Sequence, residues 1–173
     1  MAWNLDPSHT HVGFSARHLM ISTVKGEFMK SSGTVDFNEQ HPEQSSMDIS
    51  IDAASVNSRD EKRDGHLKSA DFFDVANHPV ITFKSKKVVA HSKTEAKITG
   101  DLTIRGVTHE ITLDVEHNGT QKTPWGTTMA GFSAKGKLNR KDFGLVWNAP
   151  LETGGVLVGD DVKIDIEAEL AKA

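Results

Sequence analysis

The chain has 173 residues, of which 36% are hydrophobic and 25% are charged, and its formal net charge at pH 7 is −4. This balance indicates one globular domain over residues 1–173, and the negative charge argues against a nucleic-acid partner. No apolar run approaches the ~18 residues of a membrane span and no signal peptide opens the chain, so we expect a cytoplasmic protein, or a periplasmic one whose signal has been removed.

The first predicted strand covers residues 10–18. Val12, Phe14 and Ala16 alternate there with polar or small residues, which is typical of a strand with one buried face.

The same strand ends on two adjacent polar residues, Arg17 and His18. Because neighbouring strand residues point to opposite faces, the register of the apolar residues turns His18 inward and Arg17 outward. We therefore expect His18 to be largely buried and hydrogen-bonded, to a backbone carbonyl, to an acid such as Asp60 or Asp64, or to the polar end of a ligand.

Alternation recurs along the rest of the chain, which predicts about eight or nine half-buried, antiparallel strands. The further segments are 24–38, "MDISIDA" (47–53), 80–90, "AKITGDLTI" (96–104), "HEITLDVE" (109–116), 128–138 and "VKIDIEAEL" (162–170). "RGVTH" (105–109) predicts a hairpin, "TGD" (99–101) indicates a bulge, and the Asn-Gly pair in "HNGT" (117–120) predicts a tight turn.

Residues 57–74 break the strand pattern, because the segment is charged and has few β-forming residues. It predicts one or two short helices, the first capped by Asn57 or Ser58 and the second between residues 69 and 73. The glycines of "TGGVLVGDD" (153–161) precede a strand and predict a flexible loop or the rim of a mouth.

Strands without long helices form either a sandwich or a closed barrel. A barrel of about eight strands can hold one small ligand. Many of the apolar positions carry modest residues, such as Val12, Ala16, Ala134 and Ala168, which favours an interior that is not full. The alternative is that the phenylalanines and Trp147 fill it.

The nine histidines raise the question of a metal site. "HTH" places His9 and His11 on one face of a strand, and a third ligand could be His18, His66, His78 or His109. His9 follows Pro7 at a strand start, where polar residues are ordinary. The chain has no cysteine and no H-E-x-x-H motif, so we expect no metal.

No catalytic motif stands out either. No G-x-S-x-G elbow is present. The carboxylates of Asp60, Glu61 and Asp64 are interleaved with basic residues, which is typical of a solvated helix. We therefore expect no catalytic residues.

Four collinear blocks resemble the YceI-like polyisoprenoid-binding family. They are "WNLDPSHTHVGFSARHLMISTVKGEF" (3–28), "RDGHLKSADFFDVANHPVITFKS" (63–85), "GDLTIRGVTHEITL" (100–113) and "NRKDFGL" (139–145). They span nearly the whole chain, and the central block is long and unusual.

The resemblance implies an all-β, extended antiparallel, lipocalin-like barrel with one or two short helices. Its tunnel would bind, store or transport a long isoprenoid lipid, a polyprenyl diphosphate or an isoprenoid quinone, with no cofactor required. The resemblance also implies a homodimer. Two alternatives stay open: an enzyme of isoprenoid metabolism using His18 or Asp60 as its acid–base group, and a filled barrel that serves as a protein-interaction module.

The predicted tunnel residues are large apolar side chains of these strands and of the helical segment. They are Phe14, Met20, Phe28, Phe37, Ile49, Ile51, Leu67, Phe72, Phe83, Leu102, Ile104, Leu113, Phe132 and Trp147. For the polar end of the ligand the candidates are Arg17, His18, Arg63 and His66, because a guanidinium suits a diphosphate.

Overall fold

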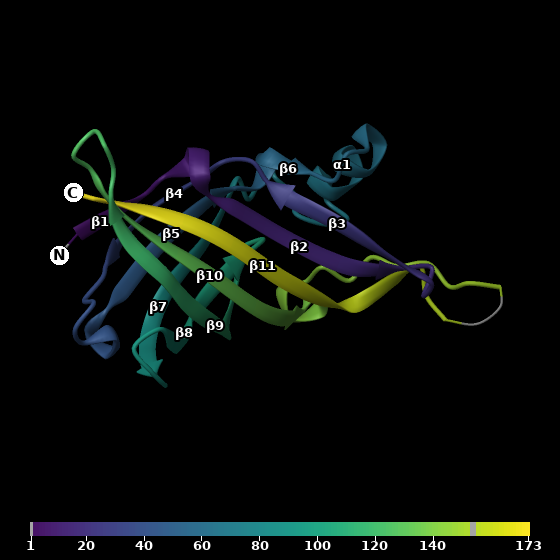
Figure 1. Ribbon diagram of the computed structural model, residues 1–173. Helices are drawn as coiled ribbons and strands as arrows, with labels where there is room; N and C mark the ends of the chain where they lie inside the picture. The colour runs from purple at the N-terminus through teal and green to yellow at the C-terminus, as the bar shows by residue number, and fades with distance from the viewer. Residues whose placement is uncertain (1, 153–154) are drawn as a thin grey trace.

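The computed structural model describes residues 2–152 and 155–173, and it is built almost entirely of β-strands (Figure 1). The strands are β1 (Ala2–Leu5), β2 (His11–His18), β3 (Ser22–Phe28), β4 (Ser31–Asp36), β5 (Ser46–Asp52), β6 (Val56–Asn57), β7 (Val80–Ala90), β8 (Glu95–Ile104), β9 (Val107–Lys122), β10 (Thr128–Asn139) and β11 (Val158–Lys172). The helices are α1 (Glu61–Lys68) and four short 3₁₀ helices, η1 (Pro7–His9), η2 (Pro42–Gln44), η3 (Ala53–Ser55) and η4 (Arg140–Phe143).

The strands form one antiparallel sheet that closes on itself. Eight strands make the ring in the order β1, β4, β5, β7, β8, β9, β10 and β11, and β11 returns to β1. Strands β2, β3 and β6 extend the sheet beyond β11. The predicted lipocalin-like barrel is therefore confirmed.

Strand β11 has two neighbours on the same edge. Its middle pairs with β2, where Ile166 lies opposite Val12, and its end pairs with β1, where Leu170 lies opposite Leu5. The short helix η1 lies at the point where the partner of β11 changes from β2 to β1, and we call this point the seam.

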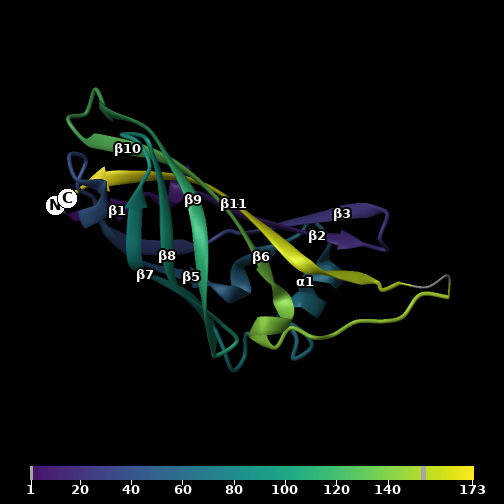
Figure 2. The same ribbon diagram turned by 90° about the horizontal axis from the view of Figure 1, so that it is seen from below.

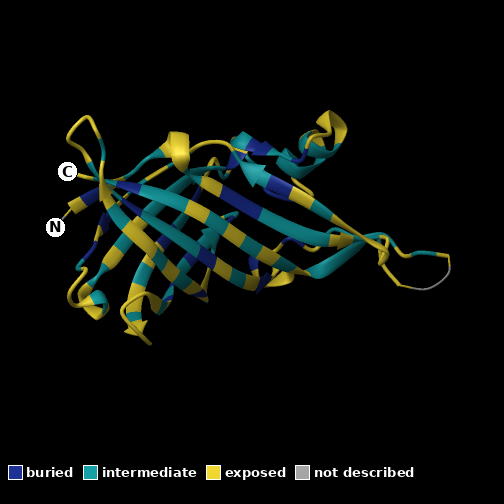
Figure 3. Ribbon diagram, in the orientation of Figure 1, coloured by how far each residue is buried: buried dark blue, intermediate teal, exposed yellow. Residues whose placement is uncertain are grey.

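Alternating burial along the strands creates the interior (Figure 3). In β8, Ile98, Leu102 and Ile104 are buried, whereas Thr99, Asp101 and Thr103, which alternate with the inward-facing residues, are half-buried. The main buried cluster includes Phe73, Phe83, Leu113 and Phe143, and a second one gathers around Trp3 and Phe37.

Two predicted elements are wrong in detail. Residues 24–38 do not form one strand, because the chain breaks at residues 29–30 between β3 and β4. The Asn118-Gly119 pair is not a tight turn either, since β9 continues to Lys122 and the chain turns at residues 123–127. Gly131 pairs with Gly119 and Phe132 pairs with His117, so Asn118 is the extra residue of a β-bulge.

The hairpin predicted at 105–109 is confirmed. Ile104 pairs with Val107 across a two-residue turn in which Arg105 and Gly106 have φ of 53° and 72°. A two-residue turn in which both residues have positive φ matches the twist of the two paired strands. The irregularity predicted at 99–101 is also present, but the extra residue is Lys86 on the facing strand β7.

The segment 57–74 contains one α-helix, α1, followed by turns at 70–73. Its N-cap is Asp60, not Asn57 or Ser58, and the Asp60 side chain accepts a hydrogen bond from the backbone N–H of Arg63. No helix among the described residues combines the length and the apolar character that a membrane crossing requires.

The barrel has two different ends (Figures 1 and 2). One end carries both chain termini, the β4–β5 connection with η2, and the β7–β8 and β9–β10 turns. The other end carries α1, η4, the β2–β3 turn and the described parts of the segment between η4 and β11. This second end extends well beyond the barrel wall.

Candidate functional site

A cavity of about 300 Å³ lies inside the barrel. Its walls are mainly aliphatic and aromatic side chains that the alternating strands turn inward. Such a space is suited to an apolar ligand and unsuited to a hydrated ion.

Most of the predicted tunnel residues line this cavity. The lining contains Phe14, Phe28, Phe37, Ile49, Ile51, Leu67, Phe72, Phe83, Leu102, Ile104, Leu113 and Phe132. Their contact with a ligand stays a prediction.

The other two predicted tunnel residues, Met20 and Trp147, do not line the cavity. Met20 is 57% exposed in the β2–β3 turn, because the strand has ended and the alternation no longer applies. Trp147 packs against the rings of His66 and Phe72, with centroid distances of 4.5 and 5.6 Å.

Further aliphatic residues complete the wall and were not among the predicted tunnel residues. They include Val12, Ala16, Ile98, Ile111, Val115, Ala134, Ile164 and Ile166. All of them fall on the inward side of the alternation, so this pattern was a sufficient signal. Val12, Ala16 and Ala134 show that small side chains on this face also belong to the wall.

The cavity is closed at the end that carries α1 and η4. Among the lining residues there, Phe72, Leu145 and Arg140 are buried, and Leu67 and Val158 are half-buried. Arg105 in the β8–β9 turn donates to the Phe72 carbonyl at 3.1 Å, which holds the segment after α1 against the barrel.

Arg140 is a buried cation at this closed end. Its guanidinium donates to the carbonyls of Leu145, Trp147, Gly159 and Val158, at 2.6, 2.9, 2.9 and 3.3 Å. Burial lowers the pKa of Arg140, and the carboxylate of Asp160 opposes that effect. Because its donors are engaged by protein carbonyls, Arg140 is a structural clamp.

The opposite end of the cavity is polar and reaches solvent. Residues 92–95 of the β7–β8 turn line the cavity and are exposed, and Ser45 and Ser46 line it beside η2. We call these residues, together with His117, the mouth. The His117 ring stacks on Phe132, with centroids 4.9 Å apart and planes at 22°.

None of the residues predicted for the polar end of the ligand lines the cavity, which corrects that prediction. Arg17 is exposed, as predicted, and donates to Thr23 Oγ1 and to the Met20 carbonyl, each at 3.2 Å. Arg63 donates to Ser58, and His66 lies 2.9 Å from Asp71 Oδ2.

Of the prediction that His18 is largely buried and hydrogen-bonded, the hydrogen bond is wrong. Its side chain is half-buried, opposite Val158, and its ring has no hydrogen bond with any described residue. The inward register of β2 holds for Val12, Phe14 and Ala16, which line the cavity. His18 is not among the lining residues, although Val158 opposite it is.

The two groups considered for acid–base chemistry therefore lie outside the cavity. Asp60 is exposed, and its pKa is lowered chiefly by the hydrogen bond from the Arg63 backbone. Neither Asp60 nor His18 is among the residues that line the cavity.

The chain is similar to known proteins in sequence and in fold. A family model described as a YceI-like domain matches residues 3–170. UPF0312 protein SA2479 of Staphylococcus aureus (strain N315) is 40% identical over 170 residues, which cover 98% of this chain and 96% of that protein.

Solved structures show the same fold. The Campylobacter jejuni YCEI protein is 38% identical with a TM-score of 0.79, over 91% of this chain and 90% of that one. Burkholderia cenocepacia BcnA is 23% identical with a TM-score of 0.84, over 95% and 98% of the two chains. A polyisoprenoid binding domain from Saccharophagus degradans is 15% identical with a TM-score of 0.67, over 99% and 98%.

Proposed function

This chain belongs to the YceI-like family, and from that membership and its cavity we propose that it binds, stores or carries a long-chain isoprenoid lipid without altering it chemically. One neighbour of the same fold is described as a polyisoprenoid binding domain, which makes an isoprenoid the first ligand to test.

The apolar cavity is the observation that carries this proposal. A prenyl chain gains on the order of 0.8 kcal/mol for each CH₂ group that it buries, and it needs few hydrogen bonds. Wall residues such as Ile98, Leu113 and Ile164 offer such a chain continuous apolar contact.

The distribution of polar residues orients the ligand. The closed end offers buried apolar side chains and an already bonded Arg140, whereas the mouth offers hydroxyls and the ring of His117. The tail therefore points to the closed end and the polar head lies at the mouth.

The mouth also bears on the choice between the two head groups. Among the described lining residues there, Lys93 and Glu95 carry opposite charges. A diphosphate would meet one lysine beside one carboxylate, which is a poor match for several negative charges. We therefore favour an uncharged head, such as that of an isoprenoid quinone, over a polyprenyl diphosphate.

Native mass spectrometry of gently purified protein, followed by organic extraction, tests the proposal first. We expect one retained lipid in each chain. The same spectrum reports the oligomeric state, for which a homodimer is the prediction. The delipidated protein is then titrated with an isoprenoid quinone and with a polyprenyl diphosphate of equal chain length.

A blocked variant shows whether binding occurs in the barrel. Ala134 lines the cavity on β10, and its neighbour Lys135 is exposed on the outer face. We expect Ala134→Trp to weaken lipid binding at least about tenfold, which corresponds to ~1.4 kcal/mol, and Lys135→Trp to leave it unchanged. If the delipidated protein binds no prenyl chain saturably, or if both variants bind alike, the proposal is wrong.

A further inference from the structure

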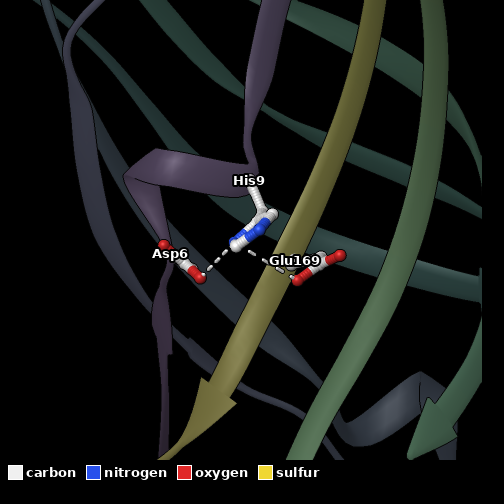
Figure 4. Close-up of side chains that lie close together, drawn as sticks. All are labelled: Asp6, His9 and Glu169. Carbon is white, nitrogen blue, oxygen red and sulfur yellow. Dashed lines mark hydrogen bonds and ion pairs between the residues drawn. The ribbon is translucent and has the colours of Figure 1, made fainter.

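Three side chains converge on the outer face of the barrel at the seam where β11 changes partner (Figure 4). Asp6 precedes η1, His9 ends it, and Glu169 projects from β11. His9 Nδ1 lies 2.9 Å from Asp6 Oδ2 and 3.7 Å from Glu169 Oε2, and the three donor atoms all lie within 4.8 Å of one another.

The backbone holds these groups in place. The N–H of Asp6 donates to the Glu169 carbonyl at 2.9 Å, so the two segments that supply the side chains are tied together. Asp6 Oδ1 accepts from the N–H and the hydroxyl of Ser8, at 3.0 and 2.7 Å. These bonds leave Oδ2, the other carboxylate oxygen, directed at His9.

The charge of the cluster is negative. Two carboxylates face one imidazole, and no lysine or arginine among the described residues forms an ion pair with Asp6 or Glu169. A cation at this point would therefore be favoured.

An imidazole nitrogen with two carboxylate oxygens is a donor set that suits Zn²⁺ and related divalent ions. With metal–ligand distances of about 2.0–2.2 Å, tetrahedral geometry separates the donor atoms by about 3.3–3.6 Å. The two distances at His9 Nδ1 lie on either side of that range. Small side-chain rotations would complete the site, and a water molecule would take the fourth position.

The site differs from the possibility that the "HTH" sequence raised. His11 does not join His9, because its Nδ1 lies 2.6 Å from Glu27 Oε2 on the neighbouring strand β3. The His11–Glu27 pair supplies two donors only, and so does the His66–Asp71 pair.

We propose that Asp6, His9 and Glu169 form a surface site for a divalent transition-metal ion of the Zn²⁺ type, which clamps η1 to β11 at the barrel seam. The site is independent of the cavity and of any lipid. The bound ion would link η1 to β11 at the point where the partner of β11 changes from β2 to β1.

Titration of the untagged, chelator-treated protein with Zn²⁺ tests the proposal, with Co²⁺ absorption as a second readout of tetrahedral coordination. We expect one saturable site, a Tm that rises with Zn²⁺, and an affinity at least tenfold weaker in His9→Gln and in Glu169→Gln. His11→Gln is the matched control, because His11 is a similarly exposed histidine paired with one carboxylate, and it should bind like the wild type.

Two outcomes would overturn the site. One is the absence of saturable Zn²⁺ binding to the folded protein. The other is binding that survives both His9→Gln and Glu169→Gln, which would place the metal elsewhere. Both substituted side chains are substantially exposed, so circular dichroism is expected to show an unchanged fold in each variant.

Discussion

The guanidinium of Arg140 lies 2.6 Å from the carbonyl oxygen of Leu145, inside the closed end of the barrel. The same side chain reaches carbonyls on both sides of the segment that joins η4 to β11. One buried residue therefore ties the start of this connection to the first residues of β11.

Arg140→Met is expected to destabilise the fold strongly. Arg140 is 2% exposed, so the substitution removes the donor from the buried Leu145 carbonyl and from the half-buried carbonyls of Trp147 and Gly159, and a buried group left unsatisfied costs about 1–3 kcal/mol. We expect a loss of roughly 3 kcal/mol or more in urea denaturation. Lys141→Met, which removes an exposed ion pair with Asp160, should cost less than about 1 kcal/mol. Similar losses in the two variants would contradict the clamp.

Gly100→Ala is expected to be harmful despite the small size of the added methyl. A Cβ at Gly100 would lie 2.5 Å from the Lys84 carbonyl oxygen and 2.7 Å from the Phe83 ring, and the backbone there cannot yield. Overpacking of this kind typically costs about 1–3 kcal/mol.

Gly131→Ala is the matched control for that substitution. Its nearest neighbour would be Asn118 Cβ at 3.8 Å, which is ordinary contact, so we expect no loss of stability. Thermal unfolding of the two variants side by side checks the difference. A Gly100→Ala protein as stable as Gly131→Ala would show that the β7–β8 contact is looser than described.

The cap of α1 is expected to depend on pH. A hydrogen bond from the Arg63 backbone lowers the pKa of Asp60 below its usual value of 3.8. A group with a depressed folded-state pKa stabilises the fold above its unfolded-state pKa, and this contribution is lost as the pH falls through the folded-state value.

The wild type should therefore be more stable than Asp60→Ala at neutral pH, and the difference should shrink as the pH falls below 3.8. Asp60→Asn keeps a capping oxygen without the charge, so its advantage over Asp60→Ala should vary little with pH. Denaturation curves at several pH values measure both differences. A constant gap between wild type and Asp60→Ala would exclude a role for the carboxylate charge.

Local patterns predicted the strands and most of the cavity wall because alternation has a direct physical cause. Val12, Phe14 and Ala16 line the cavity since successive strand residues point to opposite faces. The same rule failed at Met20, where β2 has ended. The turn predicted at the Asn118-Gly119 pair is absent because β9 stays paired with β10 past the bulge. A local turn preference contains no information about that long-range pairing.

Local sequence patterns could not predict which residues form the polar end of the cavity. Arg17, His18, Arg63 and His66 are the obvious polar residues near apolar ones in the sequence, and all of them lie outside the cavity. The closed end of the cavity is set by long-range contacts. One of them is the hydrogen bond from Arg105 to the Phe72 carbonyl, which joins residues 33 positions apart. The Asp6, His9 and Glu169 cluster was invisible for the same reason, since β11 brings Glu169 to the start of the chain.

Leu67 offers a test of the closed end. It reaches the cavity from α1, so Leu67→Ala should extend the space there and shift the preference toward longer prenyl chains, if the proposed lipid function is right. Truncating a core leucine costs about 2–5 kcal/mol, and this half-buried position should fall at the low end of that range. Lys62→Ala, on an exposed part of the same helix, controls for changes in α1. Binding is measured with polyprenols of increasing length. A tail directed to the closed end would be the part of the ligand that occupies the added space. An unchanged length preference in Leu67→Ala would therefore mean that the tail points to the mouth.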